Sequence, residues 1–341
     1  MEGIKPAGIL MVHQGGVGDF ILCLPAFGSI REHYSGAWIE LMGYPRILHL
    51  VEGRYYVDQG KSVDRAEFGS LYVENGNLGS TVSHYFSRFD LAFLFIHDRD
   101  GVFSGNVRRA GVKKVYSISP FPEKGRRVHV IDHMLSSLSS MGIPGAGSVP
   151  RILLLDEDRR FAEEWLRERG AHVGVENGLV ALHPGSGSRN NLWPIENFLQ
   201  LASRIGSDLR LNTILFVGPA EREYLGSELE RMGASSPMWA EDLPLIHVAS
   251  LLDRCRCYIG NDSGITHLAA AVGIPTIALF GPTDPEIWGP RGERVVIVRK
   301  HLDCSPCAEE GSQRCSHRRC LELIEVEEVI ERAREYLCGE Y

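Results

Sequence analysis

The sequence lacks the features that mark membrane-spanning, secreted and nucleic-acid-binding proteins. Its 341 residues contain no apolar run of about 18 residues, the length that a transmembrane helix needs. The apolar N-terminal stretch is broken by polar residues and glycines, and it has neither the charged start nor the small-residue cleavage site of a signal peptide. A formal net charge of -8 argues against a general nucleic-acid binder, which needs a basic face. We therefore expect a cytoplasmic protein without a nucleic-acid partner.

Two common phosphate-binding motifs are also absent. The stretch HQGGVGDF, residues 13–20, lies between an apolar run and a helical pattern, where a dinucleotide-binding fingerprint would stand. Gly16 and Gly18 fit G-x-G-x-x-G, but the third glycine position is Ile21, and no Gly-Lys-Ser/Thr follows as in a P-loop. The turn instead presents Asp19, whose charge would repel a phosphate. This residue is either a helix N-cap or a candidate general base.

Apolar runs alternate with helical patterns along the chain. Strands are predicted at 7–13, 38–43, 91–97, 113–119, 151–155, 178–183, 212–218, 255–260, 275–281 and 294–299. Helices are predicted to about residue 34 and at 129–142, 156–170, 194–209, 219–233, 243–255, 265–273 and 325–339. Such alternation is typical of parallel sheets that are covered by helices on both faces.

The series of strands restarts near residue 178, which indicates two domains. We predict an α/β protein with two doubly wound parallel-sheet domains, the first over 1–165 and the second over 175–322. The segment 53–83 has little periodicity and many Gly and Ser residues, so it receives no assignment beyond a possible surface insertion.

Two loops after predicted strands could bind an anion, since ligands bind beyond the carboxyl ends of parallel strands. In GNDSGITH a helix N-terminus offers N–H donors and a positive dipole end, and its candidate residues are Asp262, Ser263, Gly264 and His267. HPGSGSRNN offers small donors and a charge at Ser186, Gly187, Ser188 and Arg189. Together they suggest a diphosphate site. The alternatives are an ordinary helix cap and a plain surface loop.

A locally basic region extends over residues 108–133 and includes Arg126 and Arg127. It is either a solvated face or a surface that helps to hold an anionic acceptor.

A cluster with the spacing C-x2-C-x7-C-x4-C comprises Cys304, Cys307, Cys315 and Cys320. Four thiols at this spacing could hold zinc or iron in a structural site, because four thiolates leave no position open for a substrate. The alternative is four reduced thiols.

Several stretches resemble landmarks of a known family. The long stretch GNDSGITHLAAAVGIPTIALFGPTDPEIWGP closely resembles the C-terminal signature of glycosyltransferase family 9, the lipopolysaccharide heptosyltransferases. GGVGDFILCLPAFGSIRE resembles the N-terminal motif of that family, and HPGSGSRNNLWPIENF, LFVGPAEREYL and CSPC resemble further landmarks. The resemblance covers nearly the whole chain in order.

This resemblance implies a GT-B fold, with two Rossmann-like domains facing a central cleft. The first domain would bind the acceptor, the second the nucleotide sugar, and the helix at 325–338 would pack back on the first domain. The implied reaction is an inverting transfer of heptose from ADP-heptose to a lipid-linked core acceptor of the lipid A–Kdo type. No metal or other cofactor would be required for catalysis. Peripheral contact with the inner membrane and a monomeric state complete the expectation.

The resemblance also implies residue roles. Asp19 would be the catalytic base. The acceptor would be bound by Gly16, Gly18, Arg126 and Arg127, and the two glycines would keep this site open. Donor contacts would come from Ser186, Gly187, Ser188, Arg189, Asn191, Asp262, Ser263, Gly264 and His267. The family usually carries a lysine where Asn191 stands here, and Arg189 is the nearest cation that could replace it.

Two other functions remain open at this stage. One is a glycosyltransferase of the same fold that uses another nucleotide sugar for a surface polysaccharide or a protein. The other is a catalytically silent protein that binds a nucleotide sugar or acts as a scaffold.

Overall fold

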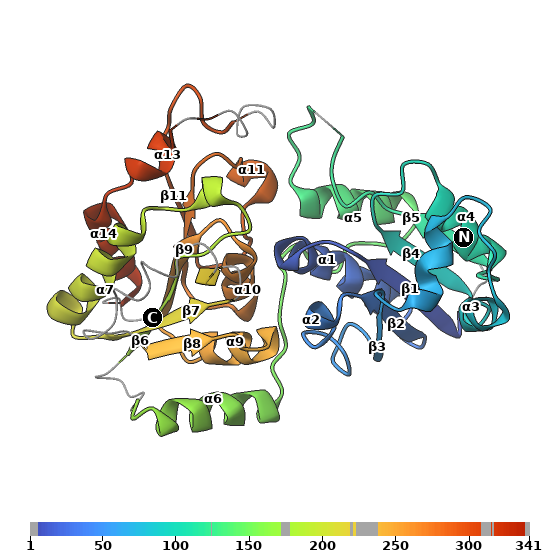
Figure 1. The fold of residues 1–341 in the computed structure, drawn as a ribbon, viewed down its shortest axis with the longest axis horizontal. Helices are drawn as coiled ribbons and strands as arrows, with labels where there is room; N and C mark the ends of the chain where they lie inside the picture. The colour runs from blue at the N-terminus through green and yellow to red at the C-terminus, as the bar shows by residue number, and fades with distance from the viewer. Residues whose placement is uncertain are drawn as a thin grey trace. The chain divides into compact units, whose positions relative to one another are not determined.

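The protein is described by a computed structural model that covers residues 6–123, 125–171, 178–218, 221–222, 238–307, 315 and 317–337. Contacts divide the chain into two compact units, Met1–Leu153 and Leu154–Tyr341, and each is described by itself (Figure 1). Within the described ranges, no helix combines the length and the apolar character needed to cross a bilayer.

The first unit is built on a parallel five-stranded sheet in the order β3-β2-β1-β4-β5. In the register of the central pair, Ile9 lies opposite Leu91 and His13 opposite Phe95. The strands are β1 (Gly8–His13), β2 (Trp38–Gly43), β3 (Gln59–Ser62), β4 (Leu91–Phe95) and β5 (Lys114–Ser117).

Helices cover both faces of the first sheet, because alternate residues of each buried strand point to opposite sides. Leu10 and Val12 face a core formed with η1, α3 and α4. His13 faces the other side, where α1 packs and Phe27 meets Phe95 edge to face. The helices of this unit are α1 (Val17–His33), α2 (Pro45–Leu48), η1 (Ala66–Tyr72), α3 (Ser80–Phe86), α4 (Val102–Arg109) and α5 (Val130–Ser140).

The second unit has a parallel six-stranded sheet in the order β11-β10-β9-β6-β7-β8. In its central pair, Val180 lies opposite Cys257 and His183 opposite Gly260. The strands are β6 (Leu179–His183), β7 (Asn212–Val217), β8 (Met238–Glu241), β9 (Cys257–Asn261), β10 (Thr276–Phe280) and β11 (Val295–Arg299).

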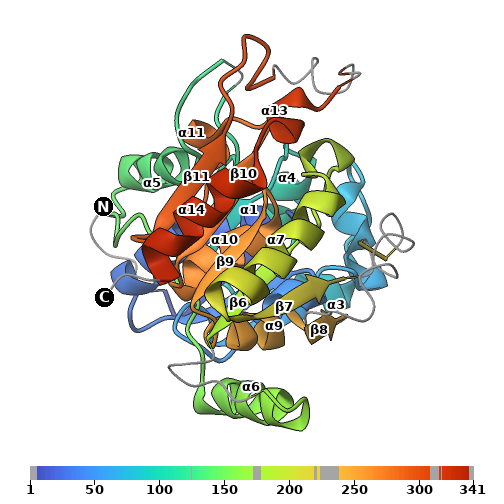
Figure 2. The ribbon, with the colours of Figure 1, turned by 90° about the vertical axis from the view of Figure 1, so that its left-hand side faces the viewer.

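Figure 2 shows α7 and α14 lying along the same face of the second sheet. Val180, Leu182 and Ile259 pack against these helices, and the opposite face is covered by α9 and α10. The helices are α6 (Asp156–Glu168), η2 (Arg189–Asn191), α7 (Ile195–Leu209), α9 (Leu245–Leu252), α10 (Gly264–Val272), α11 (Pro285–Trp288), α13 (Arg319–Glu322) and α14 (Val326–Leu337).

The structure differs from the predicted elements in a few places. Residues 151–155 form no strand, and exposed Leu153 and Leu155 belong to an extended connector that pairs with neither sheet. The segment 53–83, left unassigned, holds β3, η1 and the start of α3. The helix predicted at 219–233 lies outside the described residues except for Glu221 and Arg222.

The unit boundary also differs from the predicted one. The chain divides after Leu153 rather than at 165, because α6 packs on α9 and so belongs to the second unit. The C-terminal helix places Val329, Ile330 and Ala333 in the core of the second unit, and its packing on the first domain stays a prediction. The apolar stripe of α14 packs against α7, and both helices cover the same face of the sheet.

Candidate functional site

Strand order brings chemically active loops together within each unit. In a doubly wound sheet, ligands bind where the strand order reverses, beyond the carboxyl ends of the strands. In the first sheet this point lies between β1 and β4, so the turn that carries Asp19 comes beside the loop after Phe95. In the second sheet it lies between β6 and β9, so the loop of residues 184–188 comes beside Asp262.

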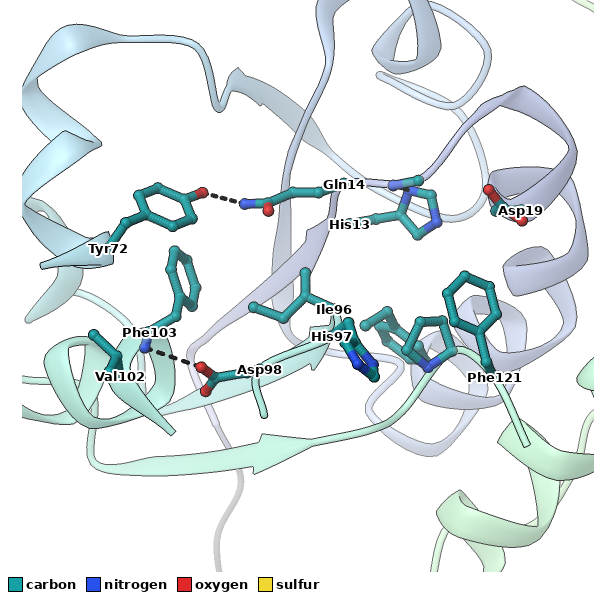
Figure 3. A pocket seen from close by; sticks show the side chains of 13 residues that line it. His13, Gln14, Asp19, Tyr72, Ile96, His97, Asp98, Val102, Phe103 and Phe121 are labelled. Carbon is teal, nitrogen blue, oxygen red and sulfur yellow. Dashed lines mark hydrogen bonds between the residues drawn. The ribbon is translucent and has the colours of Figure 1, made fainter. Parts of the chain in front are cut away.

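At its reversal point the first unit has a cavity of about 300 Å³. Figure 3 shows side chains from the β1, β4 and β5 loops gathered around it, with Tyr72 and Phe103 at one end and Phe121 near Asp19. A space of this size, lined by aromatic rings and a few polar groups, suits a small-molecule ligand. The lining residues are His13, Gln14, Gly15, Asp19, Tyr72, Phe95, Ile96, His97, Asp98, Val102, Phe103, Pro120 and Phe121.

Asp19 lies in the first turn of α1 and is half-buried at this cavity. Its Oδ2 atom accepts a hydrogen bond of 2.9 Å from the backbone N–H of Gly16, the N-cap residue. Oδ1 has no hydrogen-bond partner among the residues that the structure describes. The N-cap interpretation of Asp19 is therefore wrong, because Gly16 is the N-cap and Asp19 is the third residue of the helix. One of its oxygens supports the helix start, and the other can take a proton.

The glycines of the turn have a steric role. A Cβ atom at Gly15 would lie 2.8 Å from Cβ of Asp19 and 2.9 Å from Cε1 of His13. Both distances are shorter than non-bonded carbon atoms allow, so a side chain at Gly15 would displace one of them. Gly16 is the N-cap of α1 and Gly18 lies in its first turn, and neither lines the cavity, so their contact with an acceptor stays a prediction.

The predicted acceptor-binding arginines lie elsewhere in the first unit. Arg126 and Arg127 are exposed in the loop between β5 and α5, and neither lines the cavity. Their contact with an acceptor stays a prediction.

In the second unit, a buried amide joins the loops after β6 and β9. Asn261 is fully buried, donates to the carbonyl of Pro184 at 2.7 Å and accepts from the backbone N–H of Trp193 at 3.0 Å. The hydroxyl of Ser186 donates to the carbonyl of Asp262 at 2.7 Å. These bonds fix the two predicted donor loops to each other.

Asp262 lies at the centre of a second set of contacts. The amide of Asn191 donates to Oδ2 of Asp262 at 2.9 Å and to the hydroxyl of Thr283 at 3.2 Å. Burial raises the pKa of Asp262 to about 6, partly offset by a hydrogen bond with Thr283. Because Asn191 is neutral, it offers this carboxylate a hydrogen bond but no positive charge.

Helix α10 begins at the same place. The Ser263 side chain accepts from the backbone N–H of Thr266 and so caps the helix, which starts at Gly264. His267 is buried in the first turn of α10, while Gly187, Ser188 and Arg189 are exposed on the neighbouring loop. The helix N-terminus thus carries a cap and also faces a loop of small polar residues, as an anion site requires.

Comparison with known proteins identifies the family of the chain. The model of the family described as "Glycosyltransferase family 9 (heptosyltransferase)" matches residues 118–316, which is more than half of the chain. The lipooligosaccharide heptosyltransferase 2 of Campylobacter jejuni is 36% identical over 338 residues, covering 94% of this chain and 95% of the relative.

The chain belongs to glycosyltransferase family 9.

Solved structures of other members share its fold. A glycosyltransferase family 9 protein from Veillonella parvula superposes with a TM-score of 0.79 at 21% identity, covering 100% of this chain and 99% of that one. The ADP-heptose lipopolysaccharide heptosyltransferase II of Escherichia coli gives a TM-score of 0.72 at 18% identity, covering 97% and 98%. This family 9 glycosyltransferase therefore has the predicted α/β fold, with the two parallel-sheet domains of GT-B enzymes.

The predicted metal site of the family 9 protein is not supported. Within the described part of the chain, no group of three or more His, Cys, Asp or Glu side chains is arranged to hold a metal ion. The thiol of Cys307 donates to the carbonyl of Cys304 at 3.2 Å, and that of Cys315 donates to the carbonyl of His317. Burial raises the pKa of Cys307 and of Cys320, which favours the thiol over the metal-binding thiolate.

Sequence reasoning missed several residues at both sites of the family 9 protein. Thr283 lies within the long quoted C-terminal stretch but had no role assigned. His97 ends the predicted strand at 91–97 and Asp98 follows it, so the rule on strand ends could have found them. His183 and Glu221 lie in two quoted landmarks, but nothing local predicted their pairing, because the side chains meet only in the folded chain, with Nε2 and Oε1 3.7 Å apart.

Proposed function

We propose that this family 9 protein transfers heptose from ADP-heptose to a lipid-linked core acceptor of the lipid A–Kdo type, with inversion at the anomeric carbon. Family membership and the heptosyltransferase names of its relatives support the reaction class. The observation that carries the residue-level proposal is Asp19, with one oxygen held by Gly16 and the other at the cavity.

In the proposed reaction, a hydroxyl oxygen of the acceptor attacks the anomeric carbon of the donor sugar. The hydroxyl proton passes to the free oxygen of Asp19, and the bond between the anomeric carbon and the diphosphate oxygen breaks with its electron pair on that oxygen. Attack opposite the leaving diphosphate gives the inverted configuration. Asp19 serves as base without forming a covalent bond to the sugar.

The second unit supplies the groups for the leaving diphosphate. The N-terminus of α10 presents backbone N–H groups beyond its Ser263 cap, and these stabilise the negative charge that develops as the bond breaks. Asp262 is better suited to accept hydrogen bonds from donor hydroxyls, since a carboxylate repels a phosphate. We propose that these protein groups meet the charge without a divalent metal, so that EDTA leaves the rate of transfer unchanged.

Replacement of the proposed base tests this assignment. In Asp19→Asn, the amide oxygen can still accept from the N–H of Gly16, so the turn is retained while the base is lost. We expect transfer to fall roughly 100- to 10,000-fold, with affinity for ADP-heptose nearly unchanged. The matched control is Asp64→Asn, which changes an exposed carboxylate in a turn of the same unit. Transfer by Asp19→Asn at the control rate would exclude Asp19 as the base.

A thermal-shift panel of nucleotide sugars tests the donor. ADP-heptose is expected to raise the melting temperature, whereas UDP-sugars are not. Stabilisation by a UDP-sugar alone would favour a transferase with another donor. Absence of any transfer despite ADP-heptose binding would favour a catalytically silent protein.

The lipid-linked acceptor gives a further expectation about location. We propose that the protein works as a monomer at the inner face of the membrane through peripheral contact only. Co-sedimentation with vesicles that contain the acceptor, compared with vesicles that lack it, measures this contact.

A further inference from the structure

His13 ends strand β1 and lines the cavity next to Asp19, yet the proposed reaction gives it no role. Its side chain is 1% exposed. The ring packs edge to face on Phe20 of α1, with centroids 5.3 Å apart. The contact with Phe20 holds one side of the imidazole in place, and another side of the ring lines the cavity.

One ring nitrogen of His13 already has a partner. Nδ1 accepts a hydrogen bond of 3.3 Å from the backbone N–H of Gly15. A nitrogen that accepts carries no hydrogen, so the neutral ring must carry its hydrogen on Nε2. Among the residues that the structure describes, Nε2 has no hydrogen-bond partner, and it is not one of the fully buried polar atoms that lack one, so it is open to the cavity that His13 lines. A donor at the edge of a cavity is available to a ligand that enters it.

The free part of the ring lies near the proposed base. A single Cβ atom at Gly15 would touch both Cε1 of His13 and Cβ of Asp19, so the two side chains border the same glycine. Nδ1 is occupied by the N–H of Gly15 and Cε1 borders the same glycine, so Nε2 is the ring nitrogen left for the cavity that the ring lines. Figure 3 shows the imidazole and the carboxylate of Asp19 at the same end of the cavity, near Phe121.

Burial lowers the pKa of His13 to about 4, so the ring is neutral near pH 7. An imidazolium at this place would attract the negative charge of Asp19 and make that carboxylate a weaker base. A neutral donor can orient a substrate without this effect. The other titratable side chains at the cavity are Tyr72, His97 and Asp98, and Asp98 caps α4 through the backbone N–H groups of two residues.

We propose that His13 donates its Nε2–H to an oxygen of the acceptor saccharide, beside the hydroxyl from which Asp19 takes the proton, and so fixes the direction of attack. This inference rests on the proposed function. His13 exchanges no proton in the reaction, since its hydrogen stays on Nε2 throughout. His13 therefore contributes to the binding and orientation of the acceptor, and it makes no contribution to the binding of the donor.

Two substitutions separate the nitrogens. In His13→Asn the side-chain oxygen can replace Nδ1 as acceptor for Gly15, but no donor reaches the place of Nε2. In His13→Gln the longer side chain can bring an N–H to that place. We expect His13→Asn to lower kcat/KM for a deacylated Kdo-containing acceptor roughly 10- to 100-fold, with KM for ADP-heptose unchanged. His13→Gln should recover at least tenfold of this loss.

The outcomes are distinguishable. Equal kcat/KM for the two variants, or a loss that follows their melting temperatures, would overturn the role of His13 while leaving the transferase intact. No transfer by the wild-type protein would overturn the proposed function and this inference with it. Nitrogen-15 NMR of the wild-type imidazole adds a readout that needs no variant. We expect hydrogen on Nε2 and a change in its shift when acceptor is added, and hydrogen on Nδ1 would contradict the proposal.

Discussion

At the scale of single residues, the two sites differ in how their carboxyl groups are held. Asp19 receives a backbone N–H on one oxygen and keeps the other for chemistry. Asp262 is surrounded by the neutral partners Asn191 and Thr283, and burial without a cation raises its pKa to about 6. The family resemblance implies a lysine near the position of Asn191. In this chain Asp262 therefore has a neutral amide beside it, where the family motif would supply a cation.

The pKa of Asp262 predicts a pH-dependent donor affinity. Above about pH 6 its carboxylate can accept strong hydrogen bonds from donor hydroxyls, and protonation weakens them. We expect the dissociation constant of ADP-heptose, measured by calorimetry, to increase roughly tenfold or more as pH falls from 7.5 to 5. Asn191→Lys should move the midpoint to lower pH, because a cation favours the carboxylate.

The control is Asp303→Asn, which alters an exposed carboxylate. If Asp262→Asn retains the wild-type dependence on pH, then another group is responsible for it.

At the scale of elements, the N-terminus of helix α10 has both a structural and a proposed chemical role. Ser263 caps it, and the same hydroxyl lies 3.3 Å from Nδ1 of His183 and 3.1 Å from the hydroxyl of Thr266. Thr266 in turn contacts the hydroxyl of Tyr258 at 2.9 Å. This buried chain of polar contacts orients the helix N-terminus that the donor diphosphate is proposed to meet.

Loss of the cap is therefore expected to affect stability and donor binding together. Ser263→Ala should lower the free energy of unfolding by about 1 kcal/mol and weaken ADP-heptose binding. Ser263→Thr keeps a hydroxyl and should retain both properties. Urea unfolding and calorimetry measure the two effects. A less stable Ser263→Ala variant with wild-type donor affinity would restrict the serine to a structural role.

At the scale of the whole molecule, each unit contains a buried histidine at its strand-order reversal. Burial lowers the pKa of His13 and of His183 to about 4, and the nearby Glu221 only partly opposes the effect on His183. Between pH 4 and 6.5 the unfolded chain binds more protons at these positions than the folded chain. Stability therefore rises with pH across this window and is lost as pH falls through it.

His13→Gln tests this linkage. For one histidine shifted this far, the loss on acidification is about 3 kcal/mol. We expect the free energy of unfolding, measured with urea from pH 7 to 4.5, to fall less steeply in His13→Gln than in the wild-type protein. The exposed His49 provides the control, since His49→Gln should leave the slope unchanged. Identical slopes for His13→Gln and the wild-type protein would contradict the assignment.

The sequence predicted most of the regular elements, because the periodicity of apolar residues is a local property. The runs around residues 8–13, 38–43, 179–183 and 276–280 form strands as expected. The run at 151–155 is equally apolar but forms no strand, since a strand needs a neighbour to pair with and this segment has none. Local composition cannot supply that information.

Sequence alone thus determined the alternation of strands and helices, the glycine turn with Asp19, and the two loops at the ends of β6 and β9. Tertiary structure decided which loops meet, because the strand order places β1 beside β4 and β6 beside β9. It also decided the partners of Asp262 and the orientation of His13. Hydrogen bonds and burial join residues that are far apart along the chain, so these choices follow from packing and leave no trace in local sequence.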